Sequence, residues 1–159
     1  MKGLFYEEVE LGSEDTLGSY HFTRDAVLRF ARAFDPQPFH LDDEAARQSH
    51  FGALCASGWH TAAAWMKCYV EFNERHRSER AARGERLPAT GPSPGFENLK
   101  WLKPVYPGDT ITYSSRMTGK RTLKSRPGWG LLLSLNTGIN QAGDLVISFD
   151  GKVLIQMRE

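Results

Sequence analysis

The sequence predicts an α+β fold in which an antiparallel sheet wraps around a long, buried central helix. Residues 57–73 are apolar on nearly every face, as expected of a helix that is covered on all sides. Beyond residue 96, apolar and polar residues alternate with a period of two, which is typical of antiparallel strands with one buried face. A length of 159 residues suits one domain, so helix and sheet are expected to share one core.

The first third of the chain predicts one strand and two helices. Residues 16–22 suit a short strand, and a threonine N-cap followed by apolar residues at helical spacing predicts a helix over 23–34. This helix must end near Asp35, because a residue that precedes proline is forced out of the α region. Two prolines then stiffen a loop, and residues 42–49 can form a second short helix.

The central helix is followed by a segment of a different character. Residues 74–94 hold several arginines and then a run rich in proline and glycine. We expect a frayed helix end followed by a mobile loop, with the arginines forming a solvated charged surface.

Three segments near the C-terminus predict strands, joined by hairpin turns at 124–128 and 140–144. Their apolar residues recur at every second position and should face the helix. The residues expected on this inner face are Ile111, Tyr113, Met117, Leu131, Leu133, Leu135, Ile139, Leu145, Ile147, Phe149, Val153, Ile155 and Met157.

Composition excludes several classes of protein. A net charge of +1 gives no general attraction to nucleic acid or to an anionic membrane. Residues 1–10 lack the apolar stretch of a signal peptide, and 48–66 make a poor membrane span, so we expect a cytoplasmic protein. Cys55 and Cys68 are 13 residues apart and form no CxxC pair, which favours neither a zinc site nor a disulfide framework.

The segment Asp35-Pro36-Gln37-Pro38-Phe39-His40 is the first candidate for chemistry. A carboxylate and a histidine on a proline-braced loop could position a water molecule, take its proton and deliver a proton elsewhere. Spacing alone leaves a structural alternative open, in which Asp35 caps a turn and His40 is a packed histidine.

The start of the central helix is the second candidate. Backbone N–H groups at a helix start are unpaired and carry partial positive charge, and Gly58 would let a ligand approach them closely. The result would be an oxyanion site for a carbonyl group. The alternative is close packing of the helix start on the sheet. A third segment, residues 102–110, is predicted to form a strand, a Pro/Gly turn and a strand.

Together these three segments resemble the MaoC-like dehydratase family, which includes the (R)-specific enoyl-CoA hydratases. The family signature, Asp-x-Asn-Pro-x-His, is similar to residues 35–40, with Gln37 in place of Asn. Phe34 and Ser57 stand where the family often has Gly and His. The later family patterns are matched by Phe51-Gly52, Ala56-Ser57-Gly58, Pro104-Val105 and Gly108-Asp109-Thr110.

The resemblance implies a single MaoC-like hot-dog domain over residues 1–159 and a lyase that adds or removes water at the 2,3 double bond of an acyl thioester. Asp35 and His40 would be catalytic, Gly58 and Ser57 would bind the substrate at the oxyanion site, and Gln37 and Pro38 would support the loop. No metal or separate cofactor is implied, since coenzyme A or an acyl carrier protein is part of the substrate. A homodimer or a dimer-based oligomer is implied as well.

Two alternatives stay open. A hot-dog thioesterase would use a carboxylate to direct water at the carbonyl, and the Asp35/His40 spacing argues against it. A non-catalytic acyl-binding subunit of a heterodimeric dehydratase would have no need of an intact Asp–His pair. The arginines of 74–94 could also contact the phosphates of a carrier.

Overall fold

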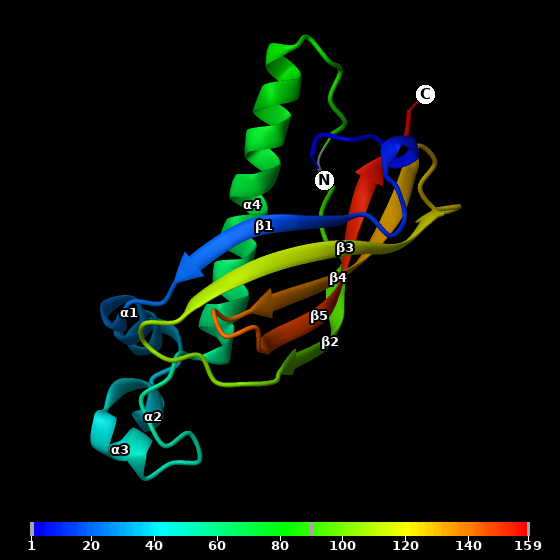
Figure 1. Ribbon diagram of the computed structural model, residues 1–159. Coiled ribbons are helices and arrows are strands. Elements are labelled where there is room, and N and C mark those ends of the chain that lie inside the picture. Colours follow the sequence, from blue (N-terminus) through cyan, green and yellow to red (C-terminus); the bar gives the residue numbers. More distant parts are fainter. Residues whose placement is uncertain (1, 90, 159) are drawn as a thin grey trace.

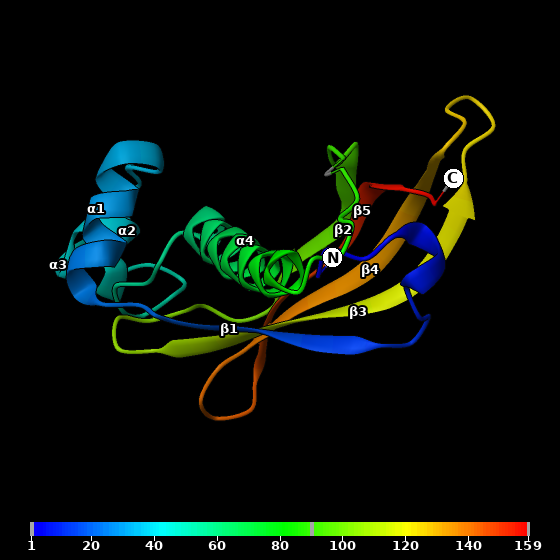
Figure 2. The ribbon, with the colours of Figure 1, turned by 90° about the horizontal axis from the view of Figure 1, so that it is seen from above.

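The computed structural model describes residues 2–89 and 91–158 and contains one curved antiparallel sheet with one long helix in its concave face (Figures 1 and 2). The elements in chain order are η1 (Tyr6–Glu8), β1 (Glu14–His21), α1 (Arg24–Phe34), α2 (Pro38–Leu41), α3 (Asp43–Arg47), α4 (Gly58–Ala82), β2 (Gly95–Trp101), β3 (Thr110–Thr122), β4 (Trp129–Ile139) and β5 (Leu145–Gln156). The strand order β1-β3-β4-β5-β2 makes β1 and β2 the two edges. This arrangement confirms the predicted α+β fold.

Helices α1 to α3 gather at one end of the molecule, beside the start of α4 (Figure 1). Helix α1 begins as predicted, because the Thr23 side chain accepts a hydrogen bond of 3.2 Å from the N–H of Ala26. The prediction of a stiff loop after α1 is partly wrong, because Pro38 begins the short helix α2. Proline suits the first position of a helix, where its fixed φ is favourable and no N–H is needed.

Helix α4 is longer than the sequence predicts, since it runs to Ala82 rather than fraying after residue 73. Its last turns are held by Arg80, whose guanidinium lies 3.1 Å from Glu8 and 2.8 Å from Glu85. Gly84, with φ of +73°, then ends the helix in the left-handed region that favours glycine. The expected mobile loop therefore shrinks to the connection after Arg83, of which Thr90 lies outside the described residues.

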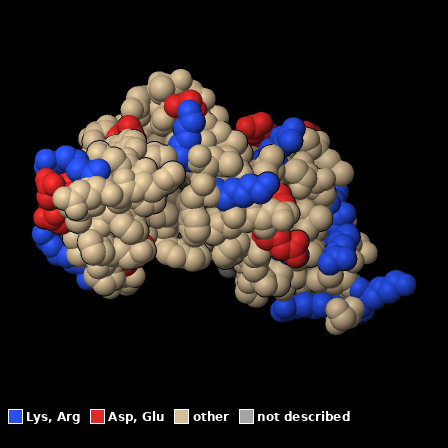
Figure 3. Space-filling model, turned by 90° about the horizontal axis from the view of Figure 1, so that it is seen from below, with Lys and Arg blue, Asp and Glu red and all other residues tan. Residues whose placement is uncertain are grey.

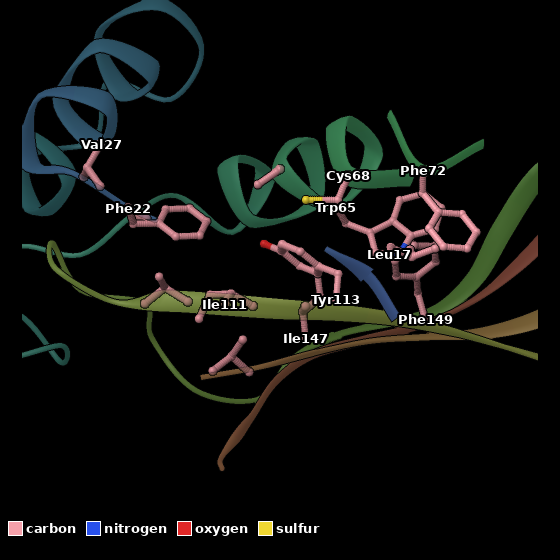
Figure 4. Packing of buried hydrophobic residues seen from close by; sticks show 14 residues of the cluster. Leu17, Phe22, Val27, Trp65, Cys68, Phe72, Ile111, Tyr113, Ile147 and Phe149 are labelled. Atoms are coloured by element: carbon pink, nitrogen blue, oxygen red, sulfur yellow. The ribbon is translucent and has the colours of Figure 1, made fainter. Parts of the chain in front are cut away.

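Only one face of α4 is buried, although the sequence predicts cover on every side. Trp65, Cys68 and Phe72 pack into the core against the sheet (Figure 4). The opposite face leaves Met66 and Val70 about half exposed, at 50% and 49%. A single curved sheet covers one side of a helix, so an apolar stripe remains at the surface.

The start of α4 is fixed to the sheet through Tyr113 of β3. This side chain is fully buried, and its hydroxyl donates a hydrogen bond of 2.9 Å to the carbonyl of Thr61 in the first turns of α4. Figure 4 shows the ring between the strands and the helix. The sheet thus sets where the helix begins, and with it the position of Gly58.

Strand β4 turns a different set of residues toward the helix from the one predicted. Asn136 and Gly138 are buried on the inner side, and a Cβ at position 138 would lie 2.7 Å from Ile147 and 2.8 Å from Tyr113. The consecutive leucines at 131, 132 and 133 fit either phase of the alternation, and the close packing at Gly138 decides between them. The predicted inner residues that the structure leaves partly or largely exposed are Met117, Leu133, Leu135, Ile139, Leu145, Val153 and Met157.

Charge is distributed unevenly over the surface. Between Asp109 and Asp144 the chain has no acidic residue but carries several lysines and arginines. Figure 3 shows Lys and Arg gathered at the end formed by the β3–β4 hairpin, whereas the end with α1 to α3 carries both signs. Within the described ranges, no helix has both the length and the hydropathy needed to cross a membrane.

Candidate active site

Asp35 lies where the chain leaves α1. Its N–H still donates to the carbonyl of Ala31 at 2.9 Å, but its φ of −150° and ψ of 70° take it out of the helix. Pro36 causes this exit, because a residue before proline avoids the α region. The Asp35 carboxylate is consequently free to meet groups from other elements.

His40 lies on α2 and is buried. Its Nδ1 lies 2.8 Å from the carbonyl oxygen of Cys55, and since a carbonyl only accepts, Nδ1 carries the proton of that hydrogen bond. The other ring nitrogen, Nε2, lies 3.5 Å from Oδ2 of Asp35. A neutral His40 therefore directs an unprotonated nitrogen at the region beside the Asp35 carboxylate.

Both oxygens of Asp35 accept hydrogen bonds. The Ser57 hydroxyl donates to Oδ2 at 2.6 Å, and the Gln37 side-chain amide donates to Oδ1 at 2.8 Å. Burial acts to raise the pKa of Asp35, but these two hydrogen bonds and the nearby His40 outweigh it and lower the pKa. Asp35 is therefore held in its ionised form.

The start of α4 completes the site. Ser57 is the N-cap, and its oxygen accepts a hydrogen bond of 3.2 Å from the N–H of Trp59. Gly58 is the first residue of the helix, so its N–H has no partner within the helix. No acceptor for that N–H is found elsewhere in the part of the chain that the structure describes. The Gly58 N–H could therefore donate a hydrogen bond to a substrate oxygen.

A pocket with a volume of about 530 Å³ brings these groups together. Asp35, His40 and Gly58 all line it. Phe39, Phe51 and Val105 give it apolar walls beside the polar groups. An apolar cavity with a few converging polar groups is typical of a small-molecule site.

Two of the candidate residues support other groups of the site and do not line the pocket. Ser57 is buried to 1% exposure and does not line the pocket, because its hydroxyl is directed at Asp35. Pro38 begins α2 and so sets the direction of the turn that carries His40. His60 also lies outside the pocket, stacked on Phe30 with ring centres 4.6 Å apart.

Three contacts of the site were not predicted from the sequence. The Cys55 carbonyl fixes His40, and no sequence pattern indicates a backbone acceptor of this kind. Thr61 and Trp101 both donate to the Gly58 carbonyl, at 2.6 and 2.8 Å. A threonine three residues into a helix start could have suggested the first contact, whereas Trp101 comes from the distant strand β2. Over residues 2–89 and 91–158, no three His, Cys, Asp or Glu side chains gather as metal ligands.

Comparison with known proteins places this geometry in context. Residues 12–128 match the family described as MaoC like domain. The chain is 27% identical over 150 residues to the uncharacterized protein YdeM of Bacillus subtilis. The aligned region covers 94% of this chain and 97% of YdeM. The chain is also 24% identical over 154 residues to an (R)-specific enoyl-CoA hydratase of Rhodospirillum rubrum. That aligned region covers 97% of this chain and 93% of the enzyme.

A solved structure is similar over nearly the whole length. It is a MaoC-like dehydratase from Rhodospirillum rubrum, with 34% identity and a TM-score of 0.81, covering 98% of this chain and 99% of that one. The sheet and central helix described above are thus shared with proteins of the hot-dog fold.

Proposed function

The chain belongs to the MaoC-like domain family, and from this premise we propose that it is a hydratase/dehydratase acting at the 2,3 double bond of an enoyl or 3-hydroxyacyl thioester. The observation that carries the proposal is the 3.5 Å approach of His40 Nε2 to Asp35 Oδ2, at a pocket that Gly58, the first residue of α4, also lines. Similarity to an (R)-specific enoyl-CoA hydratase supports the same reaction class.

Asp35 and His40 are proposed to handle the water molecule. Asp35 is held ionised by Ser57 and Gln37, so it accepts a hydrogen bond from water and orients it. The Nε2 of His40 takes a proton from this water as its oxygen bonds to C3 of the enoyl group. The same nitrogen then returns a proton to C2, and the reverse order removes water.

The N–H of Gly58 is proposed to stabilise the thioester oxygen. Attack at C3 moves electrons toward the carbonyl, so this oxygen gains negative charge before C2 is protonated. An unpaired N–H at a helix start offers a donor and the positive end of the helix dipole to that oxygen. No metal or separate cofactor is needed for these steps, and coenzyme A or an acyl carrier protein enters as part of the substrate.

A homodimer is proposed as the functional unit. Strand β2 is an edge of the sheet, and an unpaired edge is a ready site for pairing with another chain. The exposed apolar face of α4, with Met66 and Val70, is also left uncovered by the sheet. Pairing of two copies would bury this face.

The test incubates the purified protein with crotonyl-CoA and longer trans-2-enoyl-CoA substrates. Loss of the conjugated enoyl absorbance without release of free thiol is the expected result. Release of thiol would instead indicate a thioesterase. Absence of both, together with copurification of a second hot-dog chain, would indicate a non-catalytic subunit.

A further inference from the structure

Trp101 ends the edge strand β2 and points toward the helix. It lies opposite Ile147 of β5, and residues opposite one another in antiparallel strands share a face. Ile147 is fully buried in the core beneath α4, so the Trp101 side chain leaves the sheet on that same side. The strand register thereby brings an indole ring over the start of α4.

The indole of Trp101 lies directly against Gly58. A Cβ added to Gly58 would come within 2.5 Å of the ring carbon Cε2, so only glycine fits beneath the ring. The indole Nε1 donates a hydrogen bond of 2.8 Å to the Gly58 carbonyl. Thr61 donates to the same oxygen at 2.6 Å. Trp101 therefore fixes Gly58, the first residue of α4, which lines the pocket.

Trp101 also forms part of the pocket wall with Trp59. The two rings meet edge to face, with centres 5.2 Å apart, and both residues line the pocket. Trp101 is 45% exposed and Trp59 52% exposed. Two half-exposed indoles beside a polar site offer an apolar surface that a bound ligand would cover.

The position of this wall indicates which part of a thioester it meets. Gly58 follows Ser57, whose hydroxyl binds Asp35 at 2.6 Å, so the indole lies at the reacting end of the site. The adenine ring of coenzyme A is separated from the thioester sulfur by the pantetheine arm and the diphosphate, too far to reach this point when the carbonyl is at Gly58. The groups bonded to this carbonyl are the acyl chain and the sulfur that leads to the polar pantetheine arm, and the apolar face of the indole suits the acyl chain.

We propose that Trp101 is a specificity-determining residue that limits the acyl group to short chains, because its indole fills the space beside Gly58 through which a longer chain would pass. This inference rests on the proposed function and goes further by naming the substrate class. The ring acts as a wall, and its N–H holds the Gly58 peptide in place.

The test compares Trp101→Ala and Trp101→Phe with the wild type. The readout is kcat/KM for a trans-2-octenoyl-CoA substrate divided by kcat/KM for crotonyl-CoA. Trp101→Ala should raise this ratio at least tenfold, whereas Trp101→Phe, which keeps most of the wall, should change it less than threefold. Phe96→Ala is the control, since Phe96 is an exposed aromatic residue of the same strand that does not line the pocket. It should leave the ratio unchanged.

A binding measurement keeps this inference separate from the proposed reaction. Calorimetry with butyryl-CoA and octanoyl-CoA, which cannot be hydrated, should show octanoyl-CoA gaining affinity relative to butyryl-CoA in Trp101→Ala. The same shift without any turnover of enoyl substrates would overturn the hydratase proposal and support the acyl wall. Unchanged ratios in a folded Trp101→Ala, both in turnover and in binding, would overturn the role of Trp101.

Discussion

The hydroxyl of Ser57 donates a hydrogen bond of 2.6 Å to Oδ2 of Asp35, and its oxygen also caps α4 by accepting from the N–H of Trp59. One side chain therefore connects the ionised carboxylate with the helix start that presents Gly58. Because the two groups come from different elements, this hydrogen bond holds both halves of the site in register.

Ser57→Ala should impair activity more than it impairs stability. Loss of a hydrogen bond to a charged group should lower kcat/KM about tenfold and shift its acidic limb to higher pH, because the pKa of Asp35 rises. Loss of the cap should cost about 1 kcal/mol in the free energy of unfolding. Thr23→Ala removes the equivalent cap of α1 and should cost similar stability at unchanged kcat/KM. Equal activity in the two variants would contradict the link to Asp35.

Gln37→Leu should remove the second hydrogen bond to Asp35. The Gln37 amide donates to Oδ1 at 2.8 Å, so its removal favours the protonated carboxyl. We expect kcat/KM to fall three- to tenfold, on the order of 1 kcal/mol in transition-state stabilisation. The matched control is Gln48→Leu, which removes an amide donor to Glu44 on α3, outside the pocket. If both variants behave like the wild type across the pH profile, Gln37 does not tune Asp35.

His60 should make the protein less stable in mild acid. Burial, and then the charge of Arg29, lower the pKa of His60 to about 4, and its Nδ1 is buried without a hydrogen-bond partner among the described residues. The unfolded chain gains a proton near pH 6.5, whereas the folded chain resists it until about pH 4. The free energy of unfolding should thus be highest above pH 6.5 and decrease by about 2–3 kcal/mol as the pH falls toward 4.

Urea unfolding at a series of pH values measures this effect. His60→Phe should keep the stacking on Phe30 and remove most of the decrease between pH 6.5 and 4. His21→Gln, at an exposed position, should leave the decrease as it is. An unchanged profile in His60→Phe would assign the acid sensitivity to other groups.

Met66→Glu should dissociate the proposed dimer. Met66 lies on the exposed apolar face of α4, and a carboxylate there would be buried without a partner on pairing. Sedimentation velocity should show a dimer for the wild type and a shift to monomer for the variant. Leu11→Glu is the control, because Leu11 is also exposed but precedes β1, at the opposite edge of the sheet. A monomeric wild type at micromolar concentration would contradict the proposal.

Local signals in the sequence predicted much of the fold and of the site. Asp35 leaves α1 because of the following proline, and α4 begins directly after Ser57, close to the predicted start at residue 57. Each of these effects depends on neighbours only a few residues away. The spacing of residues 35–40 left a structural alternative open, and only the resemblance to the family signature favoured Asp35 and His40 as a pair.

Long-range contacts account for what the sequence could not predict. The end of α4 depends on Arg80 and Glu8, which are 72 residues apart. The contact of Trp101 with Gly58 depends on the register of an edge strand. The phase of β4 depends on which of several consecutive leucines meets the helix. In each case a distant partner decides between local alternatives that are equally acceptable.

The most direct test of the account is the rate of crotonyl-CoA hydration by Asp35→Asn and His40→Ala, with Asp42→Asn as the control. Asp42 caps α3 and does not line the pocket, and asparagine can also cap a helix. We expect kcat/KM to fall by about 10²- to 10⁴-fold in each of the first two variants, with an unchanged circular dichroism spectrum, while Asp42→Asn keeps wild-type activity. Hydration within tenfold of the wild-type rate in both Asp35→Asn and His40→Ala would contradict it.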